Sequence, residues 1–141
     1  MKILGFLVAV ATLMFAALPA DAASVEARVS LSSQRMYVSV NGVRKYSWAV
    51  STGRSGYGTP TGSYRPQRLE KMWYSSKYDN APMPHSVFFR GGYAIHGTNS
   101  VSRLGSRASH GCVRLAPGNA ATLYSLVAKY GMGNTRVVIT P

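Results

Sequence analysis

The dipeptide Asn41-Gly42 lies between two runs of residues that have the composition of β-strands. Residues 37–40 and 43–50 contain several valines and aromatic residues, which occur in strands more often than elsewhere. An Asn-Gly pair favours a two-residue hairpin turn because both of its residues tolerate positive φ. This pattern predicts an antiparallel hairpin and directs the chain toward a β fold.

Other segments also predict strands, and one predicts a helix. Strands are expected at residues 28–32, 86–89, 93–96 and 136–140, with a hairpin turn at 90–92 and a loop at 51–63. Residues 120–129 have apolar side chains at helical spacing, and the flanking residues suited to helix ends are Pro117, Asn119 and Gly131. We therefore expect a mainly β domain, a sandwich or a barrel, with one clear C-terminal helix.

The segment from residue 65 to residue 84 is harder to interpret. Residues 72–74 suit either a short strand or part of an aromatic wall. Pro82 and Pro84 argue against a regular element around them, because proline has no backbone N–H to donate. His96 is expected at the end of a strand, followed by a loop that continues to residue 108.

The N-terminus has the composition of a secretory signal peptide. Lys2 is followed by an apolar run over residues 3–18, and residues 20–22 have a small-x-small cleavage pattern. A retained membrane anchor is the alternative, but a spanning helix needs about 20 apolar residues. We expect residues 1–22 to be removed, with 23–141 forming one domain that has no stable membrane span. The expected location is the periplasm or the cell wall.

The chain is strongly basic, with 16 Lys and Arg residues, 4 Asp and Glu residues and a formal net charge of +12. Removal of Lys2 and Asp21 with the signal peptide would leave that charge unchanged. A surface of this kind attracts polyanions. Export argues against nucleic acid, so anionic cell-wall material is the expected partner, with lipid headgroups, acidic peptides and a merely solubilising charge as alternatives.

Cys112 is the single cysteine, within the stretch Ser109-His-Gly-Cys-Val-Arg-Leu115. An unpaired cysteine in an exported chain indicates either intermolecular pairing or a reactive thiol. A thiol needs a base or cation nearby to act as a nucleophile at neutral pH. His96 and His110 are candidates, and the Gly111 and Cys112 N–H groups suit a developing oxyanion. A lone buried cysteine is the structural alternative, and His85 is interpreted as a structural residue.

Two motifs resemble one known family. The stretch Ile95-His-Gly-Thr98, a spacer and then Ser109-His-Gly-Cys112 are similar to the L,D-transpeptidase catalytic domain, the YkuD-like family. The upstream stretch from Val50 to Tyr64, with its Thr-Pro-Thr-Gly, is similar to the segment that precedes the active site in that family. The resemblance extends from about residue 28 to residue 139.

The resemblance implies a β-sandwich and a site without metal or organic cofactor. It makes Cys112 the nucleophile and His96 the general base, with the Gly97 carbonyl orienting the imidazole. His110 and Gly111 would shape the oxyanion site. The candidates for substrate contact are Arg114, Ser109, Arg107 and Tyr93. For Arg114, a structural hydrogen bond that shapes the loop is the alternative.

The implied substrates are the stem peptides of peptidoglycan. The cysteine would form a thioester with the third stem residue, and the terminal D-residue would leave. An amine of a second stem would then give a cross-link between third residues, whereas water would give a carboxypeptidase.

Three other interpretations are open from the residues alone. A zinc hydrolase would use His96, His110 and Cys112 as ligands. A wall glycosidase would need two carboxylates, and Glu70 with Asp79 is the pair that lies close in sequence. A cationic protein that binds the wall without catalysis is the third.

Overall fold

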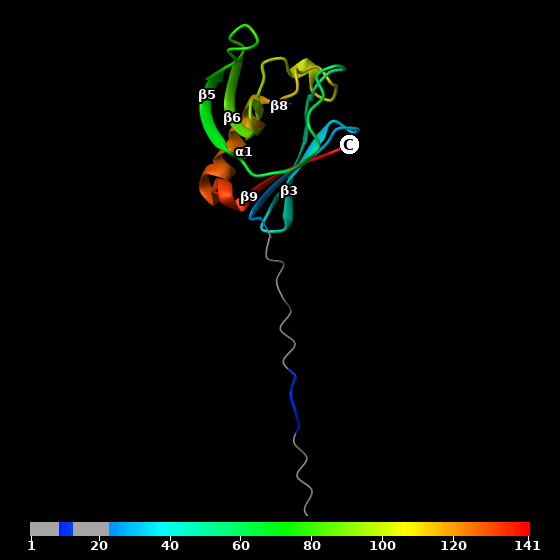
Figure 1. Ribbon diagram of the computed structural model, residues 1–141, viewed down its shortest axis with the longest axis vertical. Helices are drawn as coiled ribbons and strands as arrows, with labels where there is room; N and C mark the ends of the chain where they lie inside the picture. The colour runs from blue at the N-terminus through cyan, green and yellow to red at the C-terminus, as the bar shows by residue number, and fades with distance from the viewer. Residues whose placement is uncertain (1–8, 13–22) are drawn as a thin grey trace, which may run out of the picture.

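The computed structural model describes residues 9–12 and 23–141 (Figure 1). The expected signal peptide lies mostly outside the described residues, at 1–8 and 13–22, so its removal stays a prediction. Among residues 9–12 and 23–141, no helix combines the length and the apolar character that a membrane crossing requires.

The larger of two sheets, called sheet A, has five strands in the order β3-β2-β1-β9-β4. These strands are β1 (Val25–Ser30), β2 (Arg35–Val40), β3 (Val43–Ala49), β4 (Gly62–Tyr64) and β9 (Thr135–Thr140). Neighbouring strands are antiparallel, except that β1 and β9 run parallel at the centre. The first and the last described strands therefore lie side by side.

The smaller sheet, called sheet B, has four strands in the order β5-β6-β7-β8. They are β5 (Arg68–Tyr74), β6 (Pro82–Arg90), β7 (Tyr93–Gly97) and β8 (Val113–Leu115), and β7 and β8 run parallel. A long loop with the short 3-10 helix η1 (Val101–Arg103) connects β7 to β8. This loop delivers the segment that contains Cys112 to the end of sheet B.

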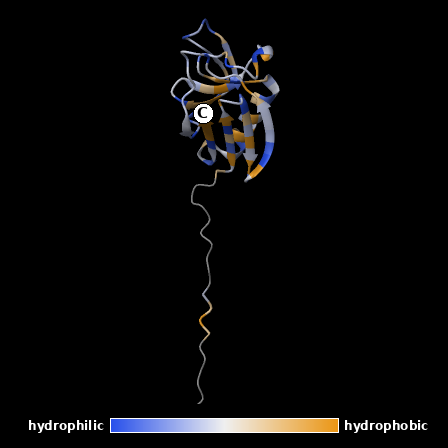
Figure 2. Cartoon of the chain, turned by 90° about the vertical axis from the view of Figure 1, so that its right-hand side faces the viewer, coloured by the Kyte–Doolittle hydropathy of each residue, from blue (hydrophilic) through white to orange (hydrophobic). Residues whose placement is uncertain are grey.

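Both sheets contribute one face to a common core. Side chains of a strand point alternately to its two faces, and β1 accordingly buries Val25, Ala27 and Val29 while its other residues are more exposed. Hydrophobic and hydrophilic residues follow one another along the strands in Figure 2. The core also contains buried residues of sheet B and of the helix: Val87, Phe89, Ile95, Val113, Leu115, Ala120, Leu123 and Val127.

The helix α1 (Pro117–Tyr130) packs against β6 and β7, and in Figure 1 it lies on the β5–β6 side of the molecule. Pro117 occupies its first turn, where the missing N–H removes no hydrogen bond. Gly131 ends it with a φ of 96°, a conformation that favours glycine. After the helix, the chain continues through the short 3-10 helix η2 (Met132–Asn134) into β9.

The mainly β architecture with one C-terminal helix is confirmed, as are both predicted hairpins. Asn41 and Gly42 have φ values of 49° and 80°, which are the positive values that the two-residue turn requires. The first strand covers residues 25–30 rather than 28–32, so its predicted boundaries were wrong.

The prediction that prolines would prevent a regular element at residues 82–84 was wrong. Strand β6 begins at Pro82 and includes Pro84. Both prolines pair only with β5, opposite Tyr74 and Met72, because pairing of β6 with β7 begins at Val87. Proline is tolerated where one side of a strand is unpaired. A local irregularity at His85, with a φ of 50°, then leads into the part of β6 that is paired on both sides.

Candidate active site

The end of sheet B displays Cys112 and His96 on the face that points away from the core. In the parallel pair β7–β8, His96 lies opposite Arg114, and Val113 is buried in the core. Because side chains alternate, Cys112 and Arg114 point to the other face. Cys112 packs there against a small buried cluster that includes Phe88 and Ala94. The strand that contains His96 and the segment that contains Cys112, which are separate in the sequence, therefore expose these side chains on the same face of sheet B.

A cavity of about 1070 Å³ opens on this face. Its walls come from the 56–58 loop, the turn between β5 and β6, the start of β7 and the Cys112 segment. Five of the residues predicted for the site line it, namely Cys112, His96, His110, Arg114 and Tyr93. The structure thus brings the predicted nucleophile and the predicted base to a single pocket.

The His96 imidazole is buried and held in one orientation. Its Nδ1 lies 2.7 Å from the Gly97 carbonyl oxygen, and because a carbonyl only accepts, Nδ1 donates and carries the proton. Nε2 is then left with a free lone pair. Burial is the main cause that lowers the pKa of His96 to about 4; the Arg114 charge adds to it and the Gly97 hydrogen bond opposes it. At neutral pH this ring is an uncharged base.

The Cys112 thiol is partly buried and protonated in the resting protein. Burial raises its pKa, while the Ala94 N–H and the Arg114 charge act in the opposite direction. Its Sγ donates a long hydrogen bond of 3.8 Å to the Gly92 carbonyl oxygen. The pair is therefore a neutral thiol and a neutral imidazole, and the thiol would have to lose its proton to act as a nucleophile.

Ser109 lies beneath the loop that carries Cys112. The residue is fully buried, and its hydroxyl donates to the Cys112 carbonyl oxygen at 2.6 Å while accepting from the Gly111 N–H at 3.0 Å. Ser109 therefore supports the loop from within rather than facing the pocket as a substrate contact. The Gly111 N–H is already paired, which leaves the Cys112 N–H as the donor on this loop for a developing oxyanion.

Thr59 is a supporting residue that the sequence interpretation missed. It is buried, and its hydroxyl accepts from the Gly53 N–H at 3.0 Å and donates to the Gly111 carbonyl oxygen at 2.7 Å. The same hydroxyl thus joins the 53–59 loop to the Cys112 loop. The Thr-Pro-Thr-Gly stretch, quoted above only for its resemblance, is the signal that pointed to it.

Replacement of Thr59 by valine is expected to lower the melting temperature and to lower about tenfold any activity that depends on Cys112. The change removes two hydrogen bonds and leaves a buried N–H and a buried carbonyl unpaired, at a cost of about 1–3 kcal/mol each. Thr59→Ser retains the hydroxyl and is the matched control. Valine and serine variants with equal activity would contradict this role.

The backbone geometry at position 111 requires glycine. Its φ of 121° is a conformation that residues with a side chain rarely adopt. A Cβ at this position would lie 2.6 Å from a ring carbon of Tyr93. Glycine therefore lets the loop approach the Tyr93 ring, which itself lines the pocket.

At the mouth of the pocket, His110 lies between two tyrosines. Its ring stacks on Tyr78, with centroids 4.1 Å apart and planes 9° apart, and meets Tyr57 edge-on at 5.0 Å. Its Nε2 is 3.4 Å from a guanidinium nitrogen of Arg54. Desolvation is the first cause that lowers the pKa of His110, and the charges of Arg54 and Arg114 act in the same direction. Neither the tyrosines nor Arg54 was predicted for the site.

The remaining candidates have different surroundings. Arg114 is half-buried in the pocket wall, and its guanidinium lies 3.5 Å from the Ala108 carbonyl oxygen. Arg107 is exposed and is not among the lining residues. His85 packs against Tyr124 of α1, outside the pocket, in keeping with the structural role expected for it.

Two of the alternative interpretations, the zinc hydrolase and the wall glycosidase, can be compared with the geometry. Within the described part of the chain, no three His, Cys, Asp or Glu side chains lie together as a set of metal ligands. Glu70 pairs with Arg68 at 3.8 Å on β5, whereas Asp79 lines the pocket, so the two carboxylates do not face each other across it. The pocket is organised around the thiol and the imidazoles.

Comparison with known proteins gives one match to a family model and several similar solved structures. The family model of the YkuD L,D-transpeptidase catalytic domain matches residues 24–139. A search of curated proteins gives no match.

Among solved structures, the fold is similar to an L,D-transpeptidase from Mycobacterium smegmatis, with a TM-score of 0.75 and 22% identity. L,D-transpeptidase 3 from Mycobacterium tuberculosis, solved with a faropenem-derived adduct, gives 0.72 and 22%. An L,D-transpeptidase from Stackebrandtia nassauensis gives 0.72 and 27%. Each alignment covers 84% of this chain, but it covers only 59%, 61% and 56% of the three solved chains, respectively. The present chain belongs to the YkuD family of L,D-transpeptidase catalytic domains.

Proposed function

We propose that this protein is an exported L,D-transpeptidase that acts on peptidoglycan stem peptides through a thioester on Cys112. The observation that carries the proposal is the placement of the Cys112 thiol in one pocket with a neutral, oriented His96. A thiol, a nearby base and backbone donors together form a site for acyl transfer. The expected location is the periplasm or the cell wall.

In the first half of the reaction, His96 Nε2 removes the thiol proton as Sγ attacks the carbonyl carbon of the third stem residue. The carbonyl oxygen gains negative charge and accepts a hydrogen bond from the Cys112 N–H. When the tetrahedral intermediate collapses, the bond from carbon to the leaving nitrogen breaks. The protonated His96 gives its proton to that nitrogen, and the terminal D-residue leaves with a thioester remaining on the enzyme.

In the second half, an acceptor replaces the thiolate. An amine of a second stem gives a cross-link between third residues, and water gives the carboxypeptidase reaction. His96 takes a proton from the acceptor and returns it to the Cys112 sulfur. With a pKa of about 4, His96 is uncharged at neutral pH, so its Nε2 is free to accept a proton.

Arg114 and His110 have supporting roles in this proposal. Arg114 keeps a positive charge in the pocket wall, where it favours an anionic sulfur and suits a substrate carboxylate. His110, held by Tyr78, forms the rim over which the stem would enter.

The decisive experiment is mass spectrometry of the products formed from purified stem tetrapeptides. A cross-linked dimer that has lost one terminal D-residue supports transfer, and a tripeptide supports hydrolysis. Tetrapeptide recovered unchanged over many hours, from protein with an intact fold, would refute the proposal.

Carbapenems are expected to acylate Cys112. The strained β-lactam carbonyl is open to an activated thiol, and one solved relative carries a faropenem-derived adduct. We expect a mass gain of one carbapenem on the peptide that contains Cys112. Since His96 must be neutral to act as base, the rate should rise between about pH 3 and 5 and show no step near pH 6.5.

The matched controls for this acylation are His96→Ala and His85→Ala. The first removes the proposed base and should slow the adduct strongly, whereas the second changes a ring that packs on α1. A Cys112 that reacts no faster than cysteine in a short peptide would show that the thiol is not activated.

A further inference from the structure

The outer face of sheet A, on the side away from the core, carries four arginines on four different strands. Strand register and the alternation of side chains place these arginines on the outer face, whereas the buried valines of the same sheet point into the core. We call this set the cationic face; it consists of Arg28, Arg35, Arg44 and Arg136. Within the strands of sheet A, all of which are described, Glu26 is the one carboxylate. The face therefore has a clear excess of positive charge.

Three of the four guanidinium groups are held by uncharged partners. Arg35 donates to the Ser47 hydroxyl at 2.9 Å and 3.2 Å, and Arg136 donates to the Ser63 hydroxyl at 3.3 Å. Arg44 lies over the Tyr37 ring, 4.2 Å from its centre. These contacts orient the side chains without neutralising them, which reduces the entropy lost when a ligand binds.

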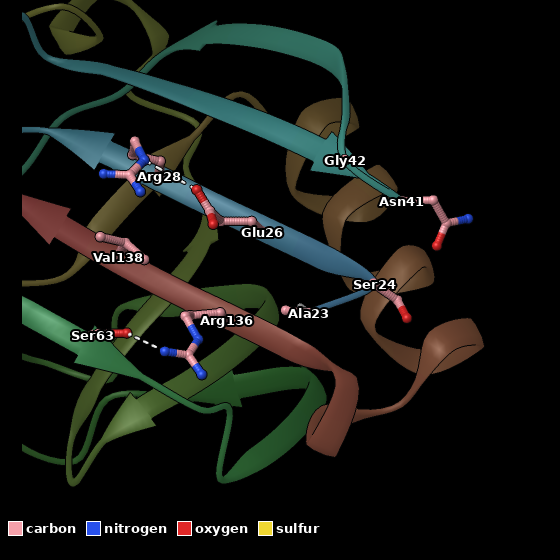
Figure 3. Close-up of a pocket in the computed structure, with 9 residues that line it drawn as sticks. All are labelled: Ala23, Ser24, Glu26, Arg28, Asn41, Gly42, Ser63, Arg136 and Val138. Carbon is pink, nitrogen blue, oxygen red and sulfur yellow. Dashed lines mark hydrogen bonds and ion pairs between the residues drawn. The ribbon is translucent and has the colours of Figure 1, made fainter. Parts of the chain in front are cut away.

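A groove of about 770 Å³ occupies the part of this face around Arg28 and Arg136 (Figure 3). Arg28 and Arg136 line it together with Ser63 and Val138, and Figure 3 shows the Arg28–Glu26 pair and the Arg136–Ser63 contact within it. The Arg28–Glu26 contact is 3.0 Å long, so Glu26 is an internal competitor for one of the arginines. Any anionic ligand in the groove would have to compete with this carboxylate.

The spacing of the arginines favours an extended ligand with several negative charges. Neighbouring strands lie about 4.8 Å apart and each residue advances about 3.3 Å. Arg28 is offset by two residues from both Arg35 and Arg136 on its neighbouring strands, which places their Cα atoms about 8 Å apart. Guanidinium groups bind carboxylates through two parallel hydrogen bonds, and such pairing is more specific than that of lysine.

The cationic face and the Cys112 pocket lie on opposite sides of the molecule. The pocket opens on the face of sheet B that points away from the core, and the groove lies on the corresponding face of sheet A. A ligand on one side therefore leaves the other side free.

We propose that the cationic face is a second binding surface, which takes the carboxylates of stem peptides along a peptidoglycan strand. The proposal rests on the proposed function, because that function places the protein among such strands. The surface would hold one strand while the Cys112 pocket acts on the stem of another. Phosphate-bearing polymers are the competing ligands that the test must exclude.

The test is sedimentation of the purified protein with insoluble peptidoglycan from which phosphate polymers have been stripped. Binding should weaken as salt rises, since exposed charges are screened. The double variant Arg35→Gln/Arg136→Gln should bind about tenfold more weakly at low salt. Glu26→Gln frees Arg28 and should bind more tightly than the unchanged protein.

The matched control is Arg90→Gln/Lys129→Gln, which removes the same charge from two exposed residues outside the face. It should bind within about twofold of the unchanged protein. An equal loss in both double variants would overturn the proposal, as would binding to polyphosphate but not to the stripped peptidoglycan.

Turnover of a soluble stem tetrapeptide, measured in parallel, separates this proposal from the proposed function. The arginine double variant should turn over the soluble peptide at the unchanged rate. Absence of turnover in the unchanged protein would refute the proposed transpeptidase activity. The effect of the arginine substitutions on sedimentation would still show whether the cationic face binds peptidoglycan.

Discussion

Replacing Cys112 by alanine is expected to abolish both transfer and hydrolysis of stem peptides while the fold is retained. The thioester cannot form without the sulfur, and the loss should be about 10⁴-fold or more. The smaller side chain still fits, because Cys112 packs only at the edge of the cluster around Phe88 and Ala94. Product mass spectrometry gives the activity, and thermal unfolding checks the fold.

The change His96→Ala should reduce activity by a similar factor. Nucleophile and base act as one unit, so the double variant should be no worse than either single variant. Activity near that of the unchanged protein in Cys112→Ala would exclude the thiol mechanism. Additive losses in the double variant would show that His96 and Cys112 act in separate steps.

The free energy of unfolding is expected to fall by about 3 kcal/mol as the pH is lowered from 6.5 toward 4, because of His96. Burial lowers the pKa of this residue from 6.5 to about 4 in the folded protein. Between these values the unfolded chain binds a proton that the folded protein does not, so acid favours unfolding. The free energy of unfolding is therefore highest above pH 6.5, and it falls as the pH approaches 4, the pKa of His96 in the folded protein.

Urea unfolding at a series of pH values between 4 and 7 measures this effect. His96→Asn keeps an N–H donor for the Gly97 carbonyl and cannot titrate, so its stability should vary much less over the same range. His85→Asn is the matched control and should retain the full dependence. An unchanged slope in His96→Asn would show that other groups cause the acid sensitivity.

The parts of the fold that the sequence predicts well are those governed by local rules. The Asn41-Gly42 turn needs only two residues that accept positive φ, and α1 needs only an apolar stripe with suitable ends. Strand β8 and the start of β6 depend instead on distant partners. Pro82 is acceptable in a strand only because β7 does not pair with it, and no local pattern reveals that.

The same distinction holds at the candidate site. Cys112 and His96 stand out because their residue types are rare and their motifs resemble one family. Thr59 is an ordinary residue until the fold brings its hydroxyl to the Gly111 carbonyl, 52 positions away. Ser109 shows the opposite error: it lies next to the predicted site in sequence and yet is fully buried beneath the loop.

The parallel pairing of β1 with β9 has a consequence for when the domain can fold. The centre of sheet A needs the last described strand, so β1 cannot acquire its second neighbour until nearly the whole domain has been synthesised. Contacts between such distant segments form slowly, because a long loop must close first. Under the export that we propose, this delay would keep the polypeptide unfolded and able to pass through a translocation channel. Loss of the six residues of β9 would leave β1 paired with β2 alone and β4 without a partner strand in sheet A, and we expect that truncated chain not to fold.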